Sequence, residues 1–363
     1  MFTEEAEAWL ILNASGLTPG RMRLLVDSLG SAAAVVGAGE ADLLEVPGLT
    51  RDQVAKLLQA RRSTDLTRQR DLCLTHGVHL VSYRDEEYPY LLTQVTEAPP
   101  LLFVQGTLTR DDHMAVALVG TRKATPYGLK VARRLAQDLA RRGFTLVSGL
   151  ALGIDAEAHE GALEAGGRTL AVMATGADIT YPAEHRGLRA RIAESGAMLS
   201  EAPFGAGPTR YAFPTRNRII AGLSLGIIVV EAPVQSGALI TAQHAADQGR
   251  EVFAVPGSID SPTSSGCHLL IKEGAHLVEV AEDVVEGLGI MLTTVPTRQD
   301  RQRPELSGEE QKVYDTLGAQ PLRVDQLTEG TGLDPARLNA TLMLLEIKGL
   351  ARRFGGGTYC RIQ

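Results

Sequence analysis

Arginine and aromatic side chains cluster between residues 204 and 218. Three arginines, Arg210, Arg216 and Arg218, stand within nine residues of one another, together with Tyr211 and Phe213. Aromatic residues make up only 4% of the chain, so this is a local enrichment. Guanidinium groups bind phosphates, and unpaired nucleobases stack on aromatic rings. The combination favours a site for single-stranded nucleic acid over a duplex, whose base faces are hidden.

Two further loops could bring cations and backbone N–H groups to the same ligand. The segment 120–126 begins Gly-Thr-Arg-Lys and ends in a proline typical of a first helical turn. The Arg122 guanidinium in this segment could form a bidentate hydrogen bond with a phosphate. The segment 148–155 begins Ser-Gly and leads into a helix, whose free N–H groups would attract an anion. By itself the second loop is weak evidence, because it has neither a dinucleotide fingerprint nor a P-loop.

Each of these features also has an explanation without a ligand. Arg122 could pair with a carboxylate at the end of a strand. Tyr211 and Phe213 could anchor a loop in the core, and Arg216 and Arg218 could point to different faces of a helix. We favour the binding site because the loops follow the carboxyl ends of expected parallel strands, where they should converge on one rim.

Residues for catalysis or metal binding are not evident in this sequence. The segment 231–242 runs from an expected strand into a helix with Ser236 as its N-cap, but a nucleophilic serine needs a partnered histidine and acid, and no such motif is present. The three cysteines, Cys73, Cys267 and Cys360, are too few and too far apart for a disulfide framework or a Cys-x-x-Cys metal site. We expect no catalytic residue, no metal and no cofactor.

A parallel sheet is the element that must position these loops. The expected strands are short apolar runs at 78–83, 101–105, 115–119, 145–148, 169–174, 227–231, 252–255 and 276–280. Helical patterns such as 127–142 and 154–165 separate most of them. Strands that are apolar on both faces and alternate with helices are typical of an open sheet covered on both sides. We predict an α/β fold whose centre, residues 78–288, is an extended Rossmann-like, doubly wound and mostly parallel domain.

Smaller domains are expected on both sides of this centre. Residues 1–75 have the apolar spacing and glycine-containing turns of a small helical domain of the SAM or helix-hairpin-helix kind. Residues 289–306 are polar and proline-flanked, as in a linker. Residues 307–363 predict a winged helix, with helices at 308–317, 323–331 and 334–348 and a hairpin at 350–362 that turns at 355–357.

The charge of the chain is unevenly distributed. The net charge is −7, which by itself disfavours a polyanionic partner. However, residues 111–230 carry 14 Lys and Arg against 11 Asp and Glu, whereas 231–290 carry 2 against 9. Because charges beyond about 10 Å are largely screened at 0.1 M salt, a local basic groove can still bind a polyanion. Acidic residues near the start and the lack of a long apolar run predict a cytoplasmic protein without a membrane partner.

Several ordered motifs together resemble the DNA-processing protein A (DprA, Smf) family. They are Gly-Thr-Arg at 120–122, Ser-Gly-Leu-Ala-Leu-Gly-Ile-Asp at 148–155, Phe-Pro-Thr-Arg-Asn-Arg-Ile-Ile-Ala-Gly-Leu-Ser at 213–224, Ser-Gly-Ala-Leu-Ile-Thr-Ala at 236–242, Val-Pro-Gly at 255–257 and Gly-Cys-His-Leu-Leu-Ile-Lys-Glu-Gly-Ala at 266–275. The resemblance implies single-stranded DNA binding, protection of incoming DNA and loading of RecA recombinase in natural transformation. It also implies a homodimer through the Rossmann-like domain, with Leu269, Leu270 and Ile271 at the interface.

The same resemblance implies a set of DNA-binding residues. These are Gly120, Arg122, Lys123, Ser148, Gly149, Arg210, Phe213, Arg216, Asn217 and Arg218. Two other functions compete with this one. A Rossmann-like phosphoribohydrolase would need a Pro-Gly-Gly-x-Gly-Thr loop and a catalytic Glu, which 233–238 lacks. A duplex-binding regulator would instead use the winged helix, with the central domain sensing a nucleotide.

Overall fold

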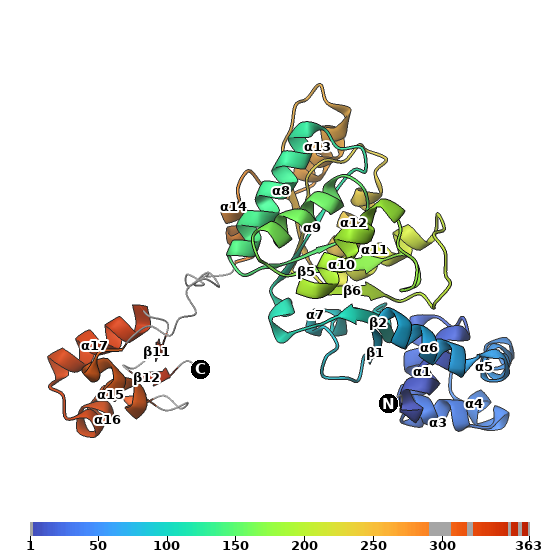
Figure 1. Cartoon of the computed structure of the whole chain (residues 1–363), viewed down its shortest axis with the longest axis horizontal. Coiled ribbons are helices and arrows are strands. Elements are labelled where there is room, and N and C mark those ends of the chain that lie inside the picture. Colours follow the sequence, from blue (N-terminus) through green and yellow to red (C-terminus); the bar gives the residue numbers. More distant parts are fainter. Residues whose placement is uncertain (1–2, 290–305, 318–321, 348–349, 355–357, 362–363) are drawn as a thin grey trace. The chain divides into compact units, whose positions relative to one another are not determined.

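The chain forms two compact units, Met1–Val295 and Pro296–Gln363, which can be followed in Figure 1. The structure is a computed structural model and describes residues 3–289, 306–317, 322–347, 350–354 and 358–361. Almost all of the linker expected at 289–306 therefore lies outside the described residues. Each unit is considered by itself below.

The first unit begins with short helices whose starts are fixed by capping side chains. Thr50 Oγ1 accepts a hydrogen bond from Gln53 N, while Gln53 Oε1 accepts one from Thr50 N, which together form a capping box. Asp65 caps the next helix through Arg68 N. The helices are α1 (Glu4–Ala14), α2 (Pro19–Leu29), α3 (Ala32–Gly37), α4 (Glu40–Glu45), α5 (Arg51–Ser63) and α6 (Leu66–His76).

These helices do not close a core of their own. Trp9, Leu25 and Leu57 are buried in one apolar cluster that continues into Leu101 and Phe103 of the sheet. The helical segment is therefore packed onto the sheet through a shared core.

A nine-stranded sheet forms the centre of the first unit, in the order β1-β2-β6-β5-β4-β3-β7-β8-β9. The pairs β1–β2 and β2–β6 are antiparallel, and the remaining pairs are parallel. The strands are β1 (Val78–Ser82), β2 (Leu101–Gly106), β3 (Ala115–Val119), β4 (Thr145–Ser148), β5 (Thr169–Met173), β6 (Ala197–Ser200), β7 (Gly226–Val229), β8 (Glu251–Ala254) and β9 (His276–Leu277). The expected α/β fold with a mostly parallel sheet is confirmed, whereas β6 was not among the expected strands.

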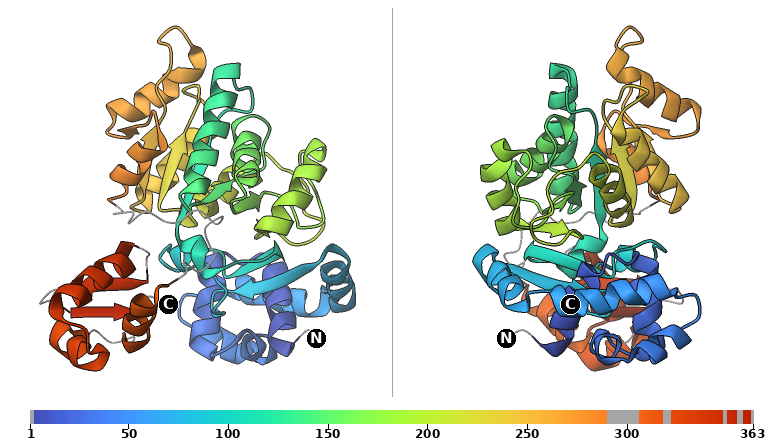
Figure 2. Two further views of the ribbon diagram at one scale, coloured as in Figure 1. Left: turned by 60° about the vertical axis from the view of Figure 1, so that its left-hand side comes forward. Right: turned by 90° about the vertical axis from the view of Figure 1, so that its right-hand side faces the viewer.

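Helices cover both faces of this sheet, and alternate residues of a strand face different helices. In β3, Ala115 and Ala117 belong to the core under α7, α11, α12 and α13, whereas Val116 and Leu118 belong to the core under α8, α9 and α14. The helices are α7 (Tyr90–Thr93), α8 (Pro126–Arg141), α9 (Ile154–Glu164), α10 (Arg186–Ser195), α11 (Ala212–Gly222), α12 (Gly237–Asp247), α13 (Ser265–Lys272) and α14 (Ala281–Gly287), with 3₁₀ turns η1 (Arg110–His113), η2 (Ala183–His185) and η3 (Pro262–Ser264). The layers are visible from two sides in Figure 2. This burial on both faces explains why the strands read as continuous apolar runs.

The chain changes direction across the sheet between β3 and β7. From β3 the strands are added on one side through β4, β5 and β6, and from β7 they are added on the other side through β8 and β9. Such a topological switch point leaves a crevice beyond the carboxyl ends of the two central strands, where ligands of open α/β sheets bind.

The second unit is a winged helix. Its elements are α15 (Gly308–Thr316), β10 (Leu322–Arg323), α16 (Val324–Thr331), α17 (Pro335–Ile347), β11 (Ala351–Phe354) and β12 (Thr358–Arg361), and the strands pair in the order β10-β12-β11. Val313, Leu327, Leu338 and Leu342 form its buried core. This confirms the predicted element order, while the expected turn at 355–357 lies outside the described residues. Within the described parts of both units, no helix has the length and apolar character needed to span a membrane.

The amino end of the sheet in the first unit is held by a mostly buried ion pair. Arg168, which precedes β5, donates from Nε and Nη2 to the two carboxylate oxygens of Asp112, both at 2.9 Å. Thr145 Oγ1, at the start of β4, donates to Asp112 Oδ1 at 2.9 Å. The Asp112 carboxylate therefore joins the starts of β3, β4 and β5 at the end of the sheet opposite to the switch-point crevice.

We predict that Asp112→Ala lowers the free energy of unfolding by about 3 kcal/mol, because Arg168 would remain buried without its partner. Urea denaturation followed by circular dichroism measures this change. The neighbouring Asp111 is exposed, and Asp111→Ala should change stability by less than about 0.5 kcal/mol. Equal effects of the two substitutions on the free energy of unfolding would contradict the stabilising role of the Asp112–Arg168 ion pair.

Candidate nucleic-acid interface

A pocket of about 510 Å³ lies at the switch point of the sheet. Four loops contribute to it, all leaving the carboxyl ends of parallel strands. The loop after β3 provides Gly120 and Arg122, the loop after β4 provides Asp155, and the segment after β6 provides Arg210 and Phe213. The loop after β7 closes the pocket with the start of α12. The expected convergence of separate loops on one rim is thus present in the structure.

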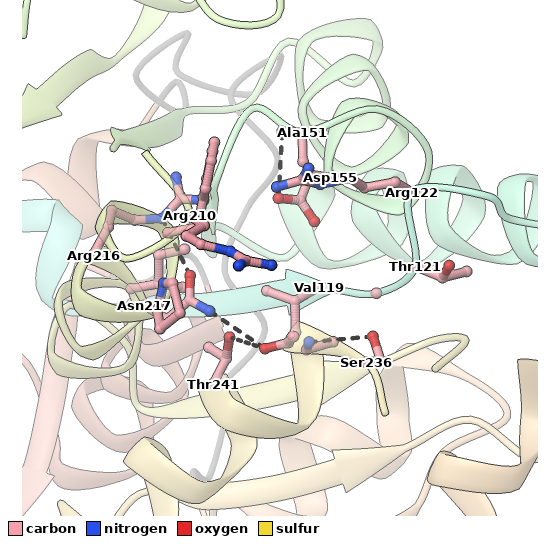
Figure 3. A pocket seen from close by; sticks show the side chains of 16 residues that line it. Val119, Thr121, Arg122, Ala151, Asp155, Arg210, Arg216, Asn217, Ser236 and Thr241 are labelled. Carbon is pink, nitrogen blue, oxygen red and sulfur yellow. Dashed lines mark hydrogen bonds between the residues drawn. The ribbon is translucent and has the colours of Figure 1, made fainter. Parts of the chain in front are cut away.

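Two of the pocket's arginines are exposed and available to a ligand. Arg122 and Arg210 are solvent-exposed, and within the described part of the chain neither guanidinium forms an ion pair. The Arg122 guanidinium lies over the Phe213 ring, with Cζ at 4.7 Å from the ring centroid. Figure 3 shows Arg210 on one side of the pocket and Arg122, beside Asp155, across from it. The pocket therefore presents two free cations from different loops next to one aromatic face, which suits a phosphate next to a base.

Arg216 has a different role, because it is buried beneath the pocket. It is 7% exposed and donates from Nη1 to Gly149 O at 2.8 Å and to Val172 O. Burial lowers the pKa of Arg216 to about 10, with Asp155 acting in the opposite direction. Its hydrogen bonds are directed to the main chain at the ends of β4 and β5, so Arg216 positions the pocket floor.

The turn after β4 is shaped around this buried arginine. A Cβ atom on Gly149 would overlap the Arg216 guanidinium, so glycine is needed there for Arg216 and not for close approach of a phosphate. The Asp155 carboxylate accepts hydrogen bonds from Gly149 N at 3.1 Å and Ala151 N at 3.4 Å. Burial raises the pKa of Asp155, while Arg216 and these N–H donors lower it. Leu150 takes a left-handed conformation with φ of 56°. The side chains of Arg216 and Asp155 hold it there through their hydrogen bonds to the main chain of Gly149 and Ala151.

Four of the predicted site residues do not line the pocket, namely Lys123, Ser148, Gly149 and Arg218. Ser148 is fully buried and its Oγ donates to Leu118 O at 2.7 Å. Arg218 is on α11, and its Nη2 donates to both carboxylate oxygens of Glu201, at 2.7 and 2.8 Å. Lys123 is exposed beside the pocket without lining it. Ser148 and Arg218 were both expected to bind DNA, but their side chains are committed to internal partners and do not reach the pocket.

Asn217 lines the pocket but is also tied into its wall. Its Nδ2 donates to Gly237 O at 3.3 Å, and its Oδ1 accepts from Arg216 Nε at 3.2 Å. This links the second turn of α11 to the start of α12, and the two helices pack against each other. Asn217 is 9% exposed, so a ligand would reach little of its side chain.

Sequence reasoning assigned no role to two residues that shape this edge. Glu231, buried at the end of β7, accepts from Thr125 N at 2.8 Å and Thr125 Oγ1 at 2.6 Å, and its carbonyl accepts from Thr121 N at 2.7 Å. It therefore anchors the loop that carries Arg122. Tyr181 lies on the loop after β5, with its ring centroid 5.6 Å from that of Phe213. An acidic residue directly after an apolar strand was a usable signal for Glu231, and the strand-end rule was a usable signal for Tyr181.

The fold and this edge pocket define a Rossmann-like binding domain joined to a winged helix. Residues 79–289 match the family model described as DNA recombination-mediator protein A, and residues 297–357 match the model described as DprA winged helix domain. The chain belongs to the DprA family, as the sequence motifs indicated.

Relatives of known name match most of the chain. Protein Smf of Escherichia coli is 37% identical over 89% of this chain and 88% of its own length. The crystal structure of DNA processing protein A from Streptococcus pneumoniae, 36% identical, matches with a TM-score of 0.69 over 78% of this chain and 98% of that one. DNA processing protein A from Helicobacter pylori, solved to describe its single-stranded DNA binding mode, is 27% identical, with a TM-score of 0.52 over 59% of this chain and 97% of that one.

Behind the pocket, α9 carries a buried and neutral histidine. The His159 Nδ1 atom lies 2.7 Å from Thr169 Oγ1, whose own hydrogen is donated to Leu146 O. The Thr169 oxygen must therefore accept from Nδ1–H, which leaves Nε2 unprotonated, and among the described residues Nε2 has no hydrogen-bond partner. Burial lowers the pKa of His159 to about 3, and His185 and Arg216 add to this effect.

We predict that this histidine makes stability fall on acidification. Its folded pKa lies below the ordinary value of 6.5, so the unfolded chain takes up the proton first. The free energy of unfolding should decrease by up to about 1.4 kcal/mol per pH unit as the pH falls below about 6.5. Urea denaturation between about pH 7 and pH 4.5 should show a shallower slope for His159→Gln than for the wild type. The exposed His113 provides the control, and His113→Gln should keep the wild-type slope. Identical slopes for all three proteins would contradict the prediction.

Proposed function

We propose that this protein binds single-stranded DNA in the switch-point pocket and does not act as an enzyme on it. The observation that carries the proposal is the pair of exposed guanidinium groups of Arg122 and Arg210, without ion-pair partners among the described residues, which line a pocket of about 510 Å³ together with the Phe213 ring. The cations bind the phosphate backbone, and the ring takes an unpaired base. Residues 78–288 then form the DNA-binding domain.

Charge and stacking act together at this pocket. Each phosphate contact releases counterions, which gives affinity without sequence preference. Stacking on Phe213 tolerates any base and requires that the base be unpaired, so it provides the preference for single strands. The net charge of −7 opposes binding at long range, but screening at ordinary salt leaves the local cations effective.

A relative supports the same assignment. The DNA processing protein A of Helicobacter pylori, which has the same fold over 97% of its length, has been described for its single-stranded DNA binding mode. Membership of the DprA family further leads us to propose that the protein acts in natural transformation in the cytoplasm, where it hands the bound strand to RecA recombinase.

We also propose that the protein is a homodimer through α13. Of the three apolar residues expected at the interface, Leu269 is 38% exposed, whereas Leu270 and Ile271 are partly buried against the sheet's core. A surface leucine next to two core residues would be covered by a second copy of the same helix. A dimer would place two DNA-binding pockets on one particle.

Arg122→Ala tests the binding proposal. The substitution removes a charged hydrogen-bond donor from the pocket, so we expect affinity for a labelled oligonucleotide to fall roughly 10- to 100-fold in fluorescence anisotropy. The slope of log affinity against log salt should also decrease by about 0.7, the value for one phosphate contact on a single strand. Arg110 is an exposed arginine before β3, at the opposite end of the sheet, and Arg110→Ala should bind like the wild type. Unchanged affinity in Arg122→Ala would remove the pocket as the binding site.

Leu269→Asp tests the dimer. A charge placed in an apolar interface is costly to bury, so the dimer dissociation constant should rise at least roughly 10-fold in sedimentation velocity. Leu74→Asp, at a leucine of α6 that is 74% exposed, should leave the dimer intact. If the wild type itself sediments as a monomer, this part of the proposal fails and the DNA-binding part remains.

A further inference from the structure

We infer that Tyr181 is a second nucleobase-stacking residue, so that the bound strand extends from the switch-point pocket across the ends of β5 and β6. This inference rests on the proposed single-stranded DNA binding and names the next contact along the same strand. The ligand is an unpaired nucleobase of any identity. Neither the sequence motifs nor the pocket lining includes Tyr181.

The topology brings Tyr181 to the same edge of the sheet as the pocket. It lies in the loop 174–182, which leaves the carboxyl end of β5. Strand β5 pairs in parallel with β4 on one side and with β6 on the other, so these loops all emerge at one edge. The ring centroids of Tyr181 and Phe213 are 5.6 Å apart. A strand that reaches Phe213 therefore has Tyr181 as its neighbour on the side away from β3 and β7.

Two features of the rings leave Tyr181 open to a ligand. Tyr181 is 43% exposed, whereas Phe213 is partly buried and already carries the Arg122 guanidinium on its ring. Base stacking on an aromatic side chain needs an accessible ring face. Of the two rings, Tyr181 offers more open surface.

The loop that carries Tyr181 is held from below by a buried cation. Arg189 of α10, only 8% exposed, donates from Nη1 to Thr180 Oγ1 at 3.0 Å and from Nη2 to Ala177 O. On the other side, Asp178 accepts from Gly205 N at 2.9 Å, which joins the loop to the segment before Arg210. An exposed ring on a loop fixed at several points loses little conformational freedom on binding, which is the property expected of a preorganised contact.

The angle between the rings selects the form of nucleic acid. The planes of Tyr181 and Phe213 are inclined by 50°. Two bases stacked on them cannot remain parallel to each other, so the strand must be splayed at this step. Paired bases in a duplex are held parallel, whereas single strands open at low cost. The ring pair therefore supports the preference for unpaired DNA independently of charge.

Substitutions of Tyr181 test the inference by fluorescence anisotropy with a labelled oligothymidylate. Tyr181→Ala should weaken binding roughly 5- to 150-fold, the range for loss of one stacked base, while Tyr181→Phe, which keeps the ring, should stay within about twofold of the wild type. Tyr90→Ala is the control, because Tyr90 is a 65% exposed tyrosine on α7 that does not line the switch-point pocket. Its affinity should equal that of the wild type.

A second measurement separates stacking from distortion of the loop. One abasic nucleotide is moved along the oligonucleotide, and affinity is measured for the wild type and for Tyr181→Ala. With a base stacked on Tyr181, one position should show an abasic penalty in the wild type that disappears in Tyr181→Ala, since the two changes remove the same contact. A distorted loop would instead lower affinity equally at every position.

The outcomes distinguish this inference from the proposed function. If the wild type binds the oligonucleotide and Arg122→Ala does not, the binding function stands. Wild-type affinity in Tyr181→Ala, or an abasic penalty that Tyr181→Ala leaves unchanged at every position, then overturns the role of Tyr181 alone. Failure of the wild type to bind any single strand overturns both.

Discussion

The buried Arg216 guanidinium is the constraint on which the pocket depends. It reaches from α11 across the sheet edge and binds the carbonyls of Gly149 and Val172, so one side chain sets the spacing between the ends of β4 and β5 and the helix that follows β6. A buried charge without such partners would be strongly destabilising, so the surrounding loops cannot rearrange freely. Gly149, Asp155 and the left-handed Leu150 are best understood as adaptations to this cation.

The arginines of this edge thus fall into two groups with different tasks. Arg216, Arg218 and Arg189 are mostly buried and hold main-chain or carboxylate partners, whereas Arg122 and Arg210 remain exposed in front of them. With rigid cations behind and exposed cations in front, the proposed anion site would need little rearrangement when it is filled. Such preorganisation reduces the entropic cost of binding a flexible strand.

The location of this site was predictable from the sequence, but the roles of its residues were only partly so. The loops Gly120–Arg122 and Arg210–Phe213 follow the strand-end rule, which depends on chain order and needs no coordinates. By contrast, Arg216 and Arg218 differ by two positions on α11 and so face different directions, and the sequence alone did not reveal that both directions are internal. Strand β6 was missed because Ala197–Ser200 contains no β-branched or aromatic residue, whereas the predicted strand 145–148, of the same length, contains a threonine and a valine. Without β6 the sheet order was incomplete, and the loop of Tyr181 had no evident neighbour.

The shared core between the helical segment and the sheet has a consequence for how the protein can be divided. Phe103 and Leu101 are covered by the same cluster that buries Trp9 and Leu25. A fragment that starts at the first strand would expose these aromatic and aliphatic side chains to water on the face of β2, beside the antiparallel junction with β6. Such an apolar patch favours self-association, so a fragment that lacks the first six helices should aggregate more readily than the full chain. The N-terminal helices therefore cover the apolar face of β2 and keep it from water.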